Sequence, residues 1–179
     1  QANFDFLTGL PNRQMFHDRL DQDLKKAHRS GLPLALMFLD LDRFKEVNDT
    51  LGHDMGDVML QETARRLSGC VRETDTVARL GGDEFTVILS ELDEPGSVDR
   101  VAQSILHKLT DPFKLGEEMV YVSASIGITL YPEDATEIEA ETPESGRHIV
   151  SVYDICGTLV WSHEFAANPV RVLRKHMPQ

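Results

Sequence analysis

Two acidic residues lie where the sequence predicts the end of a strand and a turn, positions at which a side chain is usually accessible. Asp40 lies near the end of the apolar run 34–41, and Glu84 follows the glycine pair at 81–82. Hard divalent cations take oxygen ligands, and Mg²⁺ combines one or two carboxylates with substrate phosphates. Two such ions about 4 Å apart can activate a hydroxyl and steady a leaving pyrophosphate. Asp40 and Glu84 are therefore candidate metal ligands, although an isolated acid at such a place is more often an ordinary turn residue.

Other residues around these acids have the chemistry to contact a purine nucleotide. Gly81 and Gly82 lack a Cβ and can adopt positive φ, so a nucleotide can approach the backbone closely; a tight hairpin explains them equally well. Asn48 and Asp57 offer an amide and a carboxylate, and a carboxylate can accept hydrogen bonds from N1 and N2 of guanine. The alternatives are that Asn48 forms a turn and that Asp57 begins a helix.

Hydrophobic periodicity predicts the elements that position these side chains. The predicted helices span residues 12–31, about 56–69, and 98–109. The predicted strands span residues 34–41, 76–80, 85–90 and 120–131. After one extra N-terminal helix the order is β-α-β-β-α-β, which is the ferredoxin-like α+β unit. In that topology the first strand lies beside the central hairpin, so we expect Asp40 and Glu84 to converge.

The composition changes towards the C-terminus, and the sequence there predicts an atypical tail. Residues 133–146 are acidic and polar without a trusted pattern, which is typical of a linker. Residues 148–165 predict two strands around a turn at 154–157, and hence a hairpin. We therefore divide the chain into one domain over residues 1–136 and a tail over residues 137–179.

Charge and composition exclude several classes of protein. The formal net charge of −12 disfavours nucleic acid as a partner, because a phosphate polymer needs a basic surface. The sequence has no long apolar run and no leader pattern, so we expect a cytoplasmic domain, whether or not other regions of a parent protein anchor it in a membrane. Cys70 and Cys156 lack the spacing of a zinc site or a disulfide framework.

Four motifs, in order, resemble those of a known family. They are DFLTGLPNR at 5–13, FLDLDRFKEVNDTLGHDMGD at 38–57, GGDEF at 81–85 and SASIGITLYPEDAT at 123–136. With these motifs the chain resembles the GGDEF domains of bacterial diguanylate cyclases. The resemblance implies that two GTP molecules are condensed into cyclic di-GMP with release of two pyrophosphates. It also implies an antiparallel homodimer, in which each copy holds one GTP.

The resemblance assigns roles to individual residues. Asp40 and Glu84 would bind Mg²⁺ or Mn²⁺ with the Leu41 carbonyl, and Asp83 would bind metal or assist deprotonation of the attacking 3′-hydroxyl. The implied contacts to the substrate are Asn48 and Asp57 to guanine, Lys45 and the Phe44 backbone to the phosphates, and further contacts from His53 and Gly82.

A second site is implied shortly before the GGDEF motif. Arg72 and Asp75 resemble the family's RxxD inhibitory site, where they would bind the product with a contribution from Arg100. Guanidinium groups suit phosphates and guanine edges, and a carboxylate suits guanine N1 and N2. The alternative for an arbitrary sequence is an exposed ion pair between Arg72 and Asp75.

After residue 136 the sequence departs from the family. A typical member continues into a helix with an AMYxAKxxGRN-like stretch, whose Lys and Arg hold the GTP triphosphate, and no such stretch occurs here. This difference favours a second hypothesis, a GTP- or cyclic di-GMP-binding regulatory module without catalysis that controls an attached phosphodiesterase. A generic two-metal nucleotidyl transferase is a third, but it would not explain DFLTGLPNR. The resemblance further implies a parent protein with a sensor domain, an EAL phosphodiesterase domain, or both.

Overall fold

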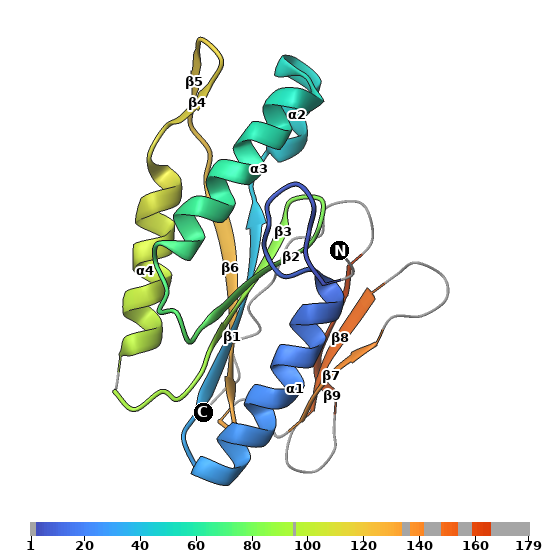
Figure 1. Cartoon of the computed structure of the whole chain (residues 1–179), viewed down its shortest axis with the longest axis vertical. Helices are drawn as coiled ribbons and strands as arrows, with labels where there is room; N and C mark the ends of the chain where they lie inside the picture. The colour runs from blue at the N-terminus through green and yellow to red at the C-terminus, as the bar shows by residue number, and fades with distance from the viewer. Residues whose placement is uncertain (1–2, 95, 134–136, 142–147, 154–158, 166–179) are drawn as a thin grey trace.

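The structure of the protein is a computed structural model that describes residues 3–94, 96–133, 137–141, 148–153 and 159–165 of the 179-residue chain (Figure 1). The helices are α1 (Arg13–Ser30), α2 (Phe44–Leu51), α3 (His53–Ser68) and α4 (Ser97–Thr110). The strands are β1 (Leu34–Leu41), β2 (Thr76–Gly81), β3 (Glu84–Leu89), β4 (Phe113–Leu115), β5 (Glu118–Val120), β6 (Ala124–Tyr131), β7 (Glu137–Glu141), β8 (His148–Tyr153) and β9 (Leu159–Phe165).

The central sheet confirms the predicted ferredoxin-like α+β fold. Its strand order is β2-β3-β1-β6, and each neighbouring pair is antiparallel. This is the order that the β-α-β-β-α-β unit produces, with β1 and β3 in the middle. Figure 1 shows α1 across one face of the sheet, with α3 and α4 across the other.

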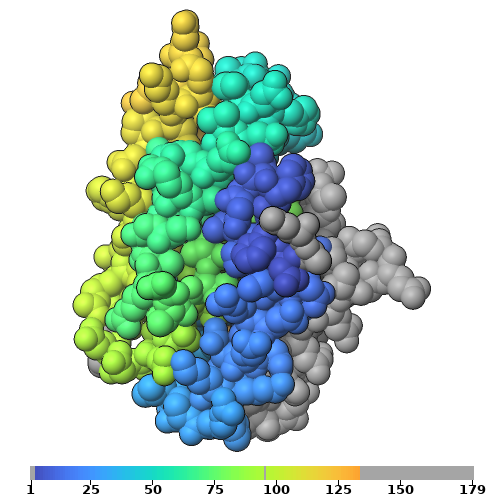
Figure 2. Space-filling model, viewed as in Figure 1, coloured from blue at the N-terminus to red at the C-terminus, as the bar shows by residue number. Residues whose placement is uncertain are grey.

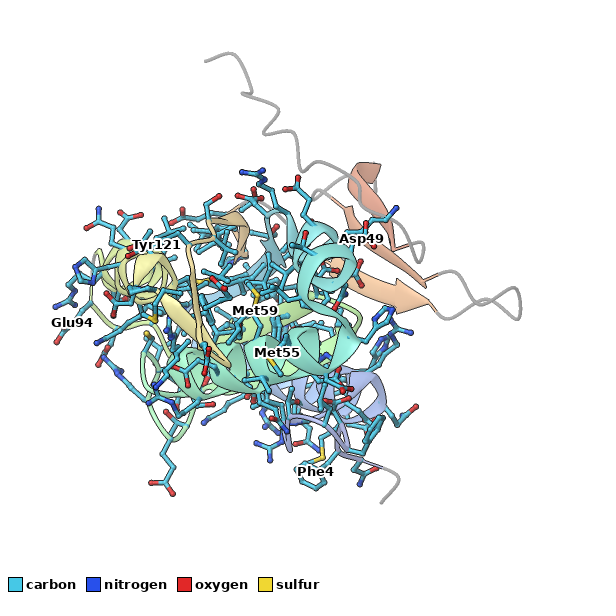
Figure 3. All side chains as sticks on the ribbon, turned by 90° about the horizontal axis from the view of Figure 1, so that it is seen from above. Phe4, Asp49, Met55, Met59, Glu94 and Tyr121 are labelled. Carbon is cyan, nitrogen blue, oxygen red and sulfur yellow. The ribbon has the colours of Figure 1, made fainter. Side chains whose placement is uncertain are left out.

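Alternate residues of β1 enter two different hydrophobic clusters, because successive side chains of a strand point to opposite faces. Leu36 packs in the cluster that contains Phe16 and Leu20 of α1. Met37 packs in the larger cluster with Met59 of α3, whose side chain lies in the interior in Figure 3. A strand covered on both faces reads as a continuous apolar run, which is the signal that predicted β1.

The first helix is the prediction that the structure confirms in most detail. Asn12 accepts a hydrogen bond at 3.1 Å from the backbone N–H of Met15, as an N-cap residue does. Gly31 ends the helix in the left-handed region with φ of 71°, and its N–H bonds to the carbonyl of Ala27.

The structure differs from the predicted elements in three places. The short helix α2 was not predicted, because turn-forming Asn48 and Asp49 obscure its apolar positions. For the same reason α3 begins at His53 rather than near residue 56. The predicted strand 120–131 is wrong in its first part, since Val120 belongs to the separate β4–β5 hairpin and β6 starts only at Ala124.

The tail contains a further three-stranded sheet, ordered β7-β8-β9. The paired strands β8 and β9 occupy the segments predicted as a hairpin, but the predicted turn at 154–157 and residues 166–179 lie outside the described residues. The predicted linker at 133–146 is wrong in part, because β7 forms there and pairs with β8. The division of the chain at residue 136 stays a prediction. None of the helices described here has the length and apolar character needed to cross a membrane.

We predict that Phe16→Ala lowers the free energy of unfolding by about 3 to 4 kcal/mol, because it leaves a cavity between α1 and the sheet. Phe16 is fully buried, whereas Phe6 is 97% exposed. The matched control Phe6→Ala should therefore change the unfolding free energy by no more than about 0.5 kcal/mol. Urea denaturation followed by circular dichroism measures both. Equal effects of the two substitutions would contradict this account of the core.

Candidate active site

The two candidate metal ligands are direct partners across neighbouring strands. Asp40 of β1 lies opposite Glu84 of β3 in the antiparallel register. Directly opposed residues in such a pair point to the same face of the sheet, with Cβ atoms about 5 Å apart. The predicted convergence of these two acids is therefore confirmed. Figure 1 places the end of β1 and the β2–β3 turn at the same end of the sheet, below α2.

The turn between β2 and β3 depends on two glycines. Gly81 has φ of 151° and Gly82 has φ of 50°, both in the region that residues with a Cβ rarely adopt. A bulge between Arg79 and Gly81 shifts the register next to the turn. The turn places Asp83 directly before Glu84 and close enough to Asp40 to raise the pKa of that carboxyl group.

Burial and the neighbouring carboxylates raise the pKa values of Asp40 and Glu84. Burial raises the pKa of Asp40 to about 7, together with the charges of Asp83 and Asp42 and the hydrogen bond from Asp83. Burial and the Asp83 charge likewise raise the pKa of Glu84 to about 7, although Arg13 opposes the shift. Ionisation of partly buried carboxyl groups close to other carboxylates is unfavourable, unless a cation binds beside them.

Two further residues, Asp42 and Arg13, border this group. Asp42 accepts hydrogen bonds from the hydroxyls of Ser123 at 2.5 Å and Ser125 at 2.9 Å, which ties β1 to β6. Arg13 begins α1, and its charge acts on Glu84, whose pKa it lowers against the effect of burial. Both residues lie within the sequence motifs at 38–57 and 5–13, but the sequence does not indicate which groups they contact in the folded chain.

The proposed guanine contacts lie on the helix pair that follows β1. Asn48 of α2 is partly buried and packs over Gly56 of α3, where a Cβ would lie 1.9 Å from the Asn48 Oδ1 atom. Because Gly56 has no Cβ, the Asn48 amide can lie directly against α3 at this position. Asp57 is the next residue of α3 and is exposed, and His53 at the start of α3 is exposed too.

The proposed phosphate contacts lie at the start of α2. Arg43 precedes this helix with φ of 65°, and Lys45 is exposed in its first turn. The ring of Phe44 is only 9% exposed and belongs to the core, so this residue can offer its backbone but not its side chain. The Leu41 side chain is buried as well, which leaves only its carbonyl as a ligand.

The residues of the predicted inhibitory site make other contacts. The Asp75 carboxylate accepts hydrogen bonds from the backbone N–H of Arg72 at 2.9 Å and of Ser90 at 3.4 Å. Within the described residues, Arg72 and Asp75 form no ion pair, and the Arg72 side chain is exposed. Arg100 of α4 is paired with Glu94 at 2.7 Å. The alternative interpretation of RxxD as a surface ion pair is therefore not what the structure shows.

We predict that Asp40→Asn stabilises the protein at pH 8 in the presence of a chelator. The pKa of Asp40 is about 7 in the folded protein against an ordinary 3.8, so the folded state holds the proton more tightly. Stability then falls as the pH rises from about 4 to about 7, and the amide side chain of Asp40→Asn removes that loss. We expect a gain of about 1 kcal/mol at pH 8, after discounting for solvent screening of a partly exposed group.

Thermal unfolding at pH 4 and pH 8 measures this effect. The difference between wild type and Asp40→Asn should be much smaller at pH 4, where Asp40 is protonated in the folded state and partly protonated in the unfolded state. Asp49→Asn is the matched control, because Asp49 is exposed on α2 and lies at the periphery in Figure 3. A wild-type protein at least as stable as Asp40→Asn at pH 8 would contradict the crowding of the carboxylates.

Known proteins share this fold and these motifs. The family described as "Diguanylate cyclase, GGDEF domain" matches residues 2–145. MucR of Pseudomonas aeruginosa, a bifunctional diguanylate cyclase/cyclic di-GMP phosphodiesterase, is 47% identical over 133 residues, which are 74% of this chain and 19% of MucR. The diguanylate cyclase TpbB of the same species is 45% identical over 149 residues, or 83% of this chain and 33% of TpbB. The chain thus spans a third or less of these relatives.

Solved structures agree with the sequence match. The GGDEF domain of TpbB superposes with a TM-score of 0.70 and 46% identity, covering 73% of this chain and 76% of that one. A coiled-coil and GGDEF fragment of DgcB from Caulobacter crescentus, solved in complex with c-di-GMP, has a TM-score of 0.67 and 28% identity, covering 72% and 69%. By the match over residues 2–145 and by these relatives, the chain belongs to the GGDEF domain family of diguanylate cyclases.

Proposed function

We propose that this domain condenses two GTP molecules into cyclic di-GMP and releases two pyrophosphates. The observation that carries the proposal is the cross-strand pair of Asp40 and Glu84, with Asp83 beside it, in a chain of the diguanylate cyclase family. A reaction that joins a 3′-hydroxyl to an α-phosphate needs an activated hydroxyl and stabilisation of the developing negative charge. A group of carboxylates at the open end of a sheet suits both tasks once cations are bound.

The donor set fits a hard divalent cation such as Mg²⁺ or Mn²⁺. Asp40, Glu84 and the Leu41 carbonyl are oxygen ligands, and the raised pKa values of about 7 for the two acids mark a place that lacks positive charge. Among the described residues, no three acidic, His or Cys side chains are already grouped to hold a metal. Mg²⁺ does not require such a cage, because substrate phosphates and water complete its coordination. When bound, the cation would polarise phosphate oxygens and lower the pKa of the attacking hydroxyl.

The chain's own residues supply base recognition and orientation. Asn48, held over Gly56, and the exposed Asp57 would hydrogen-bond the guanine edge, with His53 near the same helix start. The first N–H groups of α2 and the Lys45 ammonium would bind phosphate oxygens, which a helix N-terminus favours. Gly82, without a Cβ, leaves room for the nucleotide beside the turn. Asp83 would accept the proton of the 3′-hydroxyl or contribute to metal binding.

Two copies of the domain would form the active unit. Each site as proposed holds one GTP, and the product contains two joined nucleotides, so two sites must face each other. A homodimer with antiparallel sites meets this requirement. The proposal also includes a covalently attached sensor domain, an EAL domain, or both, in a longer parent protein.

We extend the proposal to product inhibition through the RxxD segment. The exposed Arg72 guanidinium can bind a phosphate or a guanine edge of cyclic di-GMP. Asp75 would first have to exchange its contacts with the backbone of Arg72 and Ser90, and Arg100 its pair with Glu94. The relative DgcB was solved in complex with c-di-GMP, which supports a product site within the family.

One observation favours a second candidate function. At the place where a typical member of the family has its phosphate-binding helix, this chain has the strands β7, β8 and β9. Without that helix, GTP would bind with fewer cationic contacts, each worth about 1.5 to 3 kcal/mol when charge-assisted. The domain would then bind GTP or cyclic di-GMP and regulate an attached phosphodiesterase without catalysis.

We predict that the purified domain, with GTP and Mg²⁺ at high protein concentration, forms cyclic di-GMP, and that Glu84→Gln lowers the rate by about 100-fold or more. The loss arises because an amide is a much poorer cation ligand than a carboxylate. Glu117→Gln, at an exposed turn, is the matched control and should retain the wild-type rate. Liquid chromatography of the products measures the rates of wild type, Glu84→Gln and Glu117→Gln. Nucleotide binding by calorimetry without any product would select the regulatory module instead.

We predict that Asp57→Asn lowers kcat/KM for GTP about 100-fold and improves the use of xanthosine triphosphate relative to GTP. A carboxylate accepts from guanine N1 and N2, whereas the Asn amide can donate to the xanthine O2 atom. Asp54→Asn is the control, because Asp54 is an exposed acid in the first turn of the same helix. Steady-state kinetics with both nucleotides give the ratio. An unchanged preference in Asp57→Asn would remove this residue from guanine recognition.

A further inference from the structure

A single side chain joins the β2–β3 turn to the N-terminal segment. Arg79 of β2 donates from Nε to the carbonyl oxygen of Gly82 at 2.9 Å. Its Nη1 atom donates to both carboxylate oxygens of Asp5, at 2.9 Å and 3.0 Å. The backbone N–H of Arg79 donates to the Pro11 carbonyl at 3.0 Å. The proposed reaction assigns no role to Arg79 or Asp5.

This connection is shielded from water more than an ordinary surface ion pair of the molecule. The side chains of Arg79 and Asp5 are 10% and 15% exposed, whereas those of Lys25 and Asp21 are 69% and 63% exposed. Exposed pairs contribute little, because solvent screens them and both side chains lose freedom. A shielded pair with several hydrogen bonds keeps its geometry much better, and removing one partner leaves the other uncompensated.

Asp5 is itself fixed in place. Its Oδ1 atom accepts from the Thr8 hydroxyl at 2.6 Å and from the Thr8 backbone N–H at 2.9 Å. The backbone N–H of Asp5 bonds to the Leu10 carbonyl at 2.8 Å, which closes residues 5–10 into a tight loop. The Gln61 side chain donates to the Leu7 carbonyl at 3.1 Å and ties the loop to α3. Figure 2 shows the blue N-terminal segment lying against the surface of that helix.

The turn needs an external restraint. Gly81 and Gly82 have more accessible backbone conformations than any other residue type, so a turn built on them is not rigid by itself. Asp40, Asp83 and Glu84 repel one another when ionised, which pushes the turn away from β1. A hydrogen bond to the carbonyl of Gly82 fixes the peptide unit that leads into Asp83.

We propose that Arg79, held by Asp5, is a positioning residue that keeps the Gly82–Asp83 peptide and therefore the Asp83 and Glu84 carboxylates in the geometry needed for catalysis. The proposal rests on the proposed function for its kinetic consequence, but not for its structural one. Arg79 touches neither the reacting atoms nor a metal ligand side chain. It acts through the carbonyl of the residue before Asp83.

The arginine side chain is specific for this task. Its planar fork donates in two directions at once, with Nε towards Gly82 and Nη1 towards Asp5. Lysine is a point charge at the end of a flexible stem and cannot make both contacts with fixed geometry. Arg79→Lys should therefore retain the attraction to Asp5 and lose the restraint on Gly82, which separates positioning from charge.

Hydrogen exchange tests the positioning directly, on the protein with a chelator and no nucleotide. In Arg79→Lys and Arg79→Gln the backbone amides of residues 82–84 should exchange about tenfold faster than in wild type, while those of α4 remain unchanged. Arg65→Lys is the matched control, since Arg65 is 73% exposed in its pair with Glu62 on α3. Unchanged exchange at 82–84 would overturn the proposal, and so would uniform acceleration throughout the chain, which indicates general destabilisation only.

Kinetics provide the second test. Arg79→Lys should lower kcat for cyclic di-GMP formation about tenfold or more, because small displacements of catalytic groups are costly. KM for GTP should stay within about threefold of wild type, since the guanine contacts on α2 and α3 are intact. Asp5→Asn should give a smaller loss, and Arg65→Lys none. An unchanged kcat in Arg79→Lys would overturn the proposal. If wild type itself forms no cyclic di-GMP, the proposed function fails, and the exchange experiment still decides the role of Arg79.

Discussion

The pairing of β1 with β3 brings two partly buried carboxylates face to face, and the proposed function depends on this pairing. Backbone hydrogen bonds along the strands hold Asp40 opposite Glu84, so their mutual repulsion cannot separate them without breaking the sheet. Burial, together with the charge of the neighbouring Asp83, raises the pKa values of both acids to about 7. The two hydrophobic clusters that cover the sheet stabilise the fold enough to keep these carboxylates together. A bound cation is therefore strongly favoured between them.

The rest of the site is arranged around that end of the sheet. The two glycines allow the turn to form, but they also give it a flexible backbone. The contacts of Arg79 with Asp5 and Gly82 restrain the turn. On the opposite side the chain passes directly from β1 into α2, which brings Lys45 and Asn48 near the same end (Figure 1). The groups that we propose to bind metal, to bind the base and to position the turn therefore come from segments that are far apart in sequence and adjacent in the fold.

The sequence predicted those parts of the fold that local physical rules determine. The continuous apolar run of β1, the capped helix α1 and the glycine turn each carry a strong signal over a few residues, and their combination implies the order of the strands. Asp40 and Glu84 follow from that order. The short helix α2, the β4–β5 hairpin and strand β7 were missed, because a few residues with mixed patterns do not distinguish helix, strand and turn. The contact of Arg79 with Asp5 was missed because it joins residues 74 positions apart, which no local pattern encodes.

The central claim is that the Asp40 and Glu84 pair binds the divalent cation that the reaction requires. Anomalous diffraction from crystals grown with Mn²⁺ and a GTP analogue that cannot release pyrophosphate tests this claim most directly. We expect a manganese peak within ligand distance of both carboxylates and next to the phosphates of the analogue. Manganese bound elsewhere, with both carboxylates free of metal while the analogue is in place, would contradict it.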